Sequence, residues 1–115
     1  MNDTIRARLN ELRALRDGWF DGAGVAPGKS AIDWMLGTFA KAYPEPLPAC
    51  EILPIDDGGL RLNWVGPWGA LAAEVYWPST RVRVFVMTST RGQFADVDVR
   101  RGWEPVFFMA RELCL

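Results

Sequence analysis

Residues 50–65 read CEILPIDDGGLRLNWV and decide the fold class of this chain. Apolar and polar side chains alternate after the turn: Leu60, Leu62 and Trp64 against Arg61 and Asn63. Such alternation is typical of a strand with one buried and one wet face, and an Asp-Gly step between two strands favours a tight hairpin. We therefore predict an antiparallel hairpin with Asp56 and Asp57 in its turn, where aspartate bonds its own backbone, and not a pair of catalytic acids.

The same alternation continues over ALAAEVYW (70–77), RVRVFVMT (81–88) and QFADVDV (93–99), separated by short turn segments. Short strands in succession, joined by tight turns, predict a five-stranded antiparallel meander. The alternation places Trp64 and Trp77 in the core. Asp96 and Asp98 share one face of the last strand, which we interpret as the wet face of an edge strand and not as a cation site.

Helical spacing of apolar residues brackets the strands and predicts helices over about residues 3–16, 30–43 and 104–114. Asn2 or Asp3 is the expected cap of the first helix, and Ser30, with Asp33 three residues later, that of the second. The PEPLP segment at 44–48 ends the second helix. The order ααβββββα predicts a single α+β domain over residues 1–115, with two layers and the helices on one face of the sheet.

Composition excludes several functions. The chain has 13 basic and 14 acidic residues, a net charge of −1, which disfavours general nucleic-acid binding. It has no histidine, and Cys50 and Cys114 alone cannot form a structural zinc site, so we expect no metal, no cofactor and no histidine-based catalysis. The N-terminus is polar and no apolar run approaches the roughly 20 residues of a membrane span. We therefore expect a cytoplasmic protein with reduced thiols.

The stretch AGVAPGKS (23–30) fits the loose template of a phosphate-binding loop. A buried strand normally delivers such a loop, whereas residues 3–16 predict a helix, and Pro27 removes one N–H from the cradle. We interpret the stretch as a helix–helix connection and keep nucleotide or phosphate binding as the alternative. Its candidate residues would be Gly24, Gly28, Lys29 and Ser30.

Six tryptophans in 115 residues are the best indication of an interaction surface. Tryptophan is enriched at binding hot spots because it buries a large rigid surface and keeps one donor. Four of them fall at loops, at element ends or off a helical stripe, and arginines mark one strand face. The candidate partner-binding residues are Trp19, Phe20, Trp34, Trp68, Trp103, Arg81 and Arg83.

The stretch LRALRDGWFDGAGVAPGKSAIDW (12–34), the PEPLP linker and DDGGLRLNW (56–64) together resemble a family of small uncharacterised bacterial and prophage proteins. In that family a Gly-Trp-x-Gly-type loop joins two N-terminal helices, and an Asp-Gly-Gly hairpin follows a proline-rich linker. The likeness covers about residues 9–77, and Phe20, inserted after Trp19, departs from the pattern. It implies a compact α+β domain and no activity.

We therefore expect a non-catalytic protein-binding module, a monomer or homodimer. Its size and near-neutral charge would suit an inhibitor or accessory protein of a mobile element, of the anti-CRISPR-like, antitoxin or immunity type. The partner would be another protein. Phosphate-ligand binding is the alternative function, and a small carboxylate-based enzyme is the third.

Overall fold

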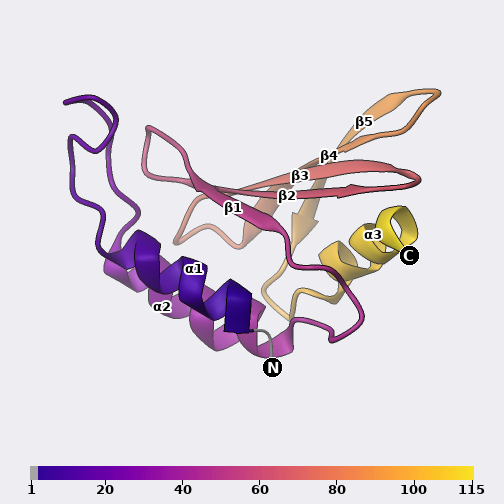
Figure 1. Ribbon diagram of the computed structural model, residues 1–115, viewed down its shortest axis with the longest axis horizontal. Coiled ribbons are helices and arrows are strands. Elements are labelled where there is room, and N and C mark those ends of the chain that lie inside the picture. Colours follow the sequence, from indigo (N-terminus) through magenta and orange to yellow (C-terminus); the bar gives the residue numbers. More distant parts are fainter. Residues whose placement is uncertain (1–2) are drawn as a thin grey trace.

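Five antiparallel strands, paired in sequence order β1-β2-β3-β4-β5, form the centre of the computed structural model, which describes residues 3–115. The strands are β1 (Glu51–Pro54), β2 (Leu60–Gly66), β3 (Gly69–Val75), β4 (Arg81–Met87) and β5 (Gly92–Asp98). The helices are α1 (Asp3–Arg13), α2 (Lys29–Met35), its π-helical continuation η1 (Leu36–Ala40) and α3 (Glu104–Cys114). The helices lie on one side of the sheet (Figure 1), which confirms the predicted α+β meander.

The core lies between the helices and the inner face of the sheet. Inward side chains of the strands alternate as predicted, and Trp64 is buried among them. Apolar stripes of the three helices cover this face with Ile5, Leu9, Ile32, Phe39, Val106 and Phe107. Trp77 was wrongly placed in the core: it is 41% exposed, because β3 ends at Val75 and the alternation no longer fixes its side.

The helix ends differ from the predicted ones. Helix α1 ends at Arg13, three residues early, and the predicted cap Asn2 lies outside the described residues. Gly28, not Ser30, is the N-cap of α2, and no side chain caps that helix. Asp33 does not complete a capping box, because its carboxylate pairs with Arg13 of α1. The ion pair joins the two N-terminal helices instead.

The Tyr43 hydroxyl connects the proline-rich linker to the sheet through hydrogen bonds. It accepts hydrogen bonds from the Trp64 indole N–H (2.9 Å) and the Cys50 main-chain N–H (3.0 Å), and it donates to the Pro48 carbonyl (2.6 Å). A hydroxyl offers one donor and two acceptor lone pairs, so its capacity is fully used. This group therefore sets where the chain enters β1.

Burial raises the pKa of the Tyr43 hydroxyl well above its usual range and raises the pKa of the Cys50 thiol to about 12. Both groups are neutral when protonated, so the folded state keeps protons that the unfolded chain releases at high pH. The stabilisation that these two raised pKa values give to the folded state is complete below about pH 8.5, the pKa of cysteine in the unfolded chain. It is lost as the pH rises above that value.

We expect the free energy of unfolding to decline between pH 9 and pH 11, by up to about 1.4 kcal/mol per pH unit for each group. Urea denaturation at successive pH values measures the decline. The decline should be smaller below about pH 10 in the Cys50→Ala variant, because this variant lacks the buried thiol and the unfolded pKa of Tyr43 is near 10. Identical pH profiles for the two proteins would contradict the assignment to Cys50.

Candidate functional site

The sheet face opposite the helices carries the candidate site. Figure 1 shows this face uncovered. Strand register aligns its outward side chains in rows that run across β2, β3, β4 and β5 in that order. The rows are Arg61–Glu74–Arg83–Asp96, Asn63–Ala72–Phe85–Phe94 and Val65–Ala70–Met87–Gly92. We call this surface the open face.

Charges alternate in sign along the first row of the open face. The Arg61 guanidinium pairs with the Glu74 carboxylate at 2.9 Å. Arg83 and Asp96 follow in register on β4 and β5, and neither forms an ion pair with another residue of the described range 3–115. The charged groups in the outer half of this row, Arg83 and Asp96, are therefore available to pair with a partner.

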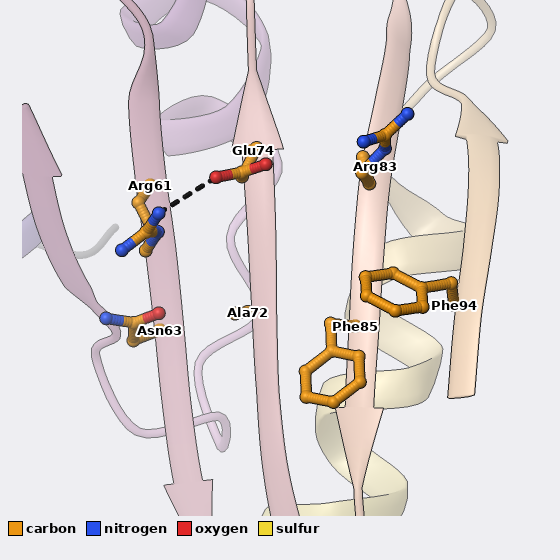
Figure 2. A pocket seen from close by; sticks show the side chains of 7 residues that line it. All are labelled: Arg61, Asn63, Ala72, Glu74, Arg83, Phe85 and Phe94. Atoms are coloured by element: carbon orange, nitrogen blue, oxygen red, sulfur yellow. Dashed lines mark hydrogen bonds and ion pairs between the residues drawn. The ribbon is translucent and has the colours of Figure 1, made fainter. Parts of the chain in front are cut away.

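The second row combines a hollow with an aromatic pair. The rings of Phe85 and Phe94 lie 4.7 Å apart between centroids, and Phe94 is 72% exposed. Ala72, the smallest side chain in the row, leaves a hollow of about 320 Å³ between the rings and the charged row (Figure 2). Exposed Val65 and Met87 continue the apolar area into the third row. The open face thus places apolar and charged groups side by side.

The structure separates the predicted partner-binding residues. Arg81 and Arg83 lie on the open face of β4, as predicted from the alternation. Trp19 and Phe20 lie in the loop between α1 and α2, at the opposite end of the molecule from α3 (Figure 1). The Trp19 indole N–H donates to the Val25 carbonyl (3.0 Å) and so anchors this loop, while Phe20 is exposed.

Of the other three predicted tryptophans, Trp34 and Trp103 contact each other, and Trp68 lies elsewhere, in the turn between β2 and β3. Trp34 is half-buried between the rings of Trp77 and Trp103. Trp68 is 65% exposed in the turn between β2 and β3, whose main chain bonds to Leu113 of α3. Trp103 is only 1% exposed, so it belongs to the core and cannot contact a partner in this conformation, contrary to the prediction.

The AGVAPGKS loop uses part of its main chain to hold its own conformation. Three of its N–H groups donate within the protein: Ala23 to the Phe20 carbonyl, Val25 to the Asp56 carbonyl and Ala26 to the Asp17 carboxylate. The chain reaches the loop from helix α1, not from a strand. Gly24 has φ +94°, and an added Cβ would lie 3.0 Å from the Phe20 Cβ, so packing explains this glycine. Lys29 and Ser30 open α2 beyond these occupied groups.

The same loop pairs with the β1–β2 turn. Val25 forms an isolated parallel bridge with Asp57, and its N–H lies 2.7 Å from the Asp56 carbonyl. The two aspartates therefore serve a structural turn, as predicted. Across residues 3–115, no cluster of three or more His, Cys, Asp and Glu side chains could hold a metal ion, and no helix is long and apolar enough to cross a membrane.

Phe85 and Phe94 were not predicted as site residues. Alternation placed Phe85 beside Arg83 on one face of β4, but a single strand does not reveal its neighbours. The hairpin register, in which Phe85 faces Phe94 and Arg83 faces Asp96, joins the two faces into one surface. Counting outward from the short turn between the two strands would have identified this pairing.

Comparison with known proteins adds no relative. A scan against protein-family models, a search of curated proteins and a search of solved structures gave no match to this chain. Function is therefore inferred from the surface itself.

Proposed function

We propose that this protein is a non-catalytic binding module that holds a partner protein on the open face. The observation that carries the proposal is the exposed Phe94, in ring contact with Phe85 and bordered by the alternating charged row. Contiguous exposed apolar area rimmed by polar groups marks interaction sites, whereas single exposed apolar residues are ordinary. The role we propose is that of an inhibitor or accessory protein of a mobile element, of the anti-CRISPR-like, antitoxin or immunity type.

The charge pattern favours a protein partner over a nucleic acid. Glu74 and Asp96 stand beside Arg61 and Arg83 in one row, so the open face carries both signs, and the whole chain has a net charge of −1. Binding to a phosphate backbone gains from a concentration of positive charge, which this face lacks. Protein interfaces combine an apolar centre with a charged rim, and the open face has both.

The test is affinity capture from the native host with the wild-type protein and the Phe94→Ser variant. We expect a partner that the wild type retains and the variant binds at least about tenfold more weakly, because loss of a central aromatic hot spot costs about 2 kcal/mol or more. Phe108→Ser is the matched control, since Phe108 is also exposed but lies on α3, in the helical layer. Equal retention by all three proteins would refute the open face as the binding surface.

A thermal-shift measurement tests the phosphate alternative in the same samples. Millimolar ATP or GTP with magnesium should leave the melting temperature unchanged, because the N–H groups of Ala23, Val25 and Ala26 already have acceptors and no strand delivers the chain to the loop. Lys29→Ala should retain the partner like the wild type. A rise of several degrees that Lys29→Ala abolishes would instead favour the nucleotide-binding function.

A further inference from the structure

We infer that the partner contributes an extended segment that pairs with the free edge of β5 as an additional strand, with Lys or Arg opposite Asp96 and an apolar side chain on Phe94. This inference rests on the proposed function, because it names how the partner binds. In strand addition of this kind, main-chain hydrogen bonds supply affinity and alternate side chains supply specificity.

The main-chain groups of β5 show which residues an added strand would meet. Strand β5 pairs with β4 alone and lies at the outer edge of the sheet (Figure 1). At the two ends of this pair, the Thr88 N–H donates to the Arg91 carbonyl and the Val99 N–H donates to the Thr80 carbonyl. Both pairs are thus hydrogen-bonded, and bonded pairs alternate with non-bonded ones in an antiparallel ladder.

The alternation places Phe94 and Asp96 in non-bonded pairs with β4, opposite Phe85 and Arg83. Their own N–H and C=O groups therefore point away from β4, toward the free edge. No group in the described residues 3–115 bonds to them there. The side chains of the same two residues lie on the open face, so an added strand would extend the rows already present.

The charged row specifies the partner's chemistry. Its sign alternates from Arg61 through Glu74 and Arg83 to Asp96, so the next position outward calls for a positive charge. Opposite charges in directly facing positions stabilise a sheet and like charges destabilise it. In the neighbouring row the outer side of the Phe94 ring is uncovered and suits an apolar side chain. The expected segment therefore carries a basic and an apolar residue two positions apart.

The free edge strands of a second folded copy do not meet that requirement. Strand β5 reads GQFADVD, strand β1 reads EILP, and neither contains Lys or Arg. Antiparallel pairing of two β5 strands would place Asp96 opposite a neutral or acidic residue of the strand in every register. The carboxylates on this edge thus oppose self-association and favour a basic partner.

A peptide copy of residues 80–88, TRVRVFVMT, is a suitable probe because it repeats the Arg83 and Phe85 spacing that already faces β5 in the fold. Fluorescence anisotropy with the labelled peptide measures its dissociation constant. We expect the peptide to bind, and the peptide carrying Arg83→Glu to bind about tenfold more weakly, as expected for reversal of a facing charge. The Asp96→Arg protein should reverse this preference, whereas Glu112→Arg, an exposed change on α3, should not.

N-methylation of the peptide at the Phe85 position removes an N–H that would donate to β5, and we expect it to abolish binding. Amide exchange at Phe94 and Asp96 should slow when the unmodified peptide binds. Failure of the copied strand to bind, indifference to the charge reversal, or equal binding of the N-methylated peptide would each overturn strand addition. Melting temperatures verify that the Asp96→Arg protein is folded, and Asp96→Asn supplies a milder second variant that should weaken binding without reversing the preference.

The two proposals can fail separately. If the captured partner depends on Phe94 but binds Asp96→Arg as well as wild type, the open face remains the binding surface and strand addition is wrong. If capture is indifferent to Phe94, the proposed function itself is wrong.

Discussion

Replacing Trp103 with alanine is expected to lower the free energy of unfolding by about 3–5 kcal/mol. The side chain is almost fully buried, its ring centroid lies 4.9 Å from that of Phe39, and its indole N–H donates to the Thr38 hydroxyl at 3.0 Å. Truncation would remove this contact area and leave a cavity between η1 and α3. It would also leave the Thr38 hydroxyl without the hydrogen bond from the indole N–H. Urea denaturation of the purified variant measures the loss.

Trp68→Ala is the matched control for this substitution. Trp68 is exposed in a turn, so its truncation should change the free energy of unfolding by no more than about 0.5 kcal/mol. A similar loss of unfolding free energy for both variants would contradict the assignment of Trp103 to the core.

Replacing Tyr43 with phenylalanine is expected to cost about 2–4 kcal/mol. The change removes one oxygen and leaves the Cys50 N–H, the Trp64 indole N–H and the Pro48 carbonyl without their partner. A buried polar group without a partner costs more than the hydrogen bond itself contributes. Chemical denaturation again gives the magnitude.

Tyr76→Phe provides the comparison, because it removes the same atom from an exposed site. The Tyr76 hydroxyl donates to the Asp57 carboxylate at 3.0 Å, where water can replace it, so we expect a loss below about 1 kcal/mol. Equal losses for the two tyrosines would mean that the Tyr43 hydroxyl does not hold the linker.

The sheet could be predicted because the sequence features that determine it lie within each strand and each turn. Alternation in each segment fixes which side chains turn inward, and the turn residues Asp56 and Gly58 fix how β1 and β2 pair. Trp77 was misplaced because alternation holds only while the strand lasts. Ser30 was misassigned as a cap because the helix begins one residue earlier, at Lys29, and the expected capping box fails because Asp33 pairs with Arg13, which is distant in sequence.

The candidate site was less predictable, because the residue composition of the chain does not show where each aromatic side chain lies in the fold. Trp103 directly precedes a helix, so the sequence indicated a position at the end of a secondary-structure element. The packing of η1 against α3 nevertheless buries it. Phe94 stands on an edge strand between exposed residues, which gave no reason to select it. Its significance comes from Phe85 on the neighbouring strand, and only the pairing of the two strands reveals that relation.

The bridge from Val25 to the β1–β2 turn has a consequence for local motion. The two segments richest in glycine, which would each be expected to fluctuate alone, share a main-chain hydrogen bond across more than thirty residues of sequence. Opening either one breaks that bond. We therefore expect the helical connection and the hairpin tip to open together, as one cooperative unit, in amide-exchange measurements.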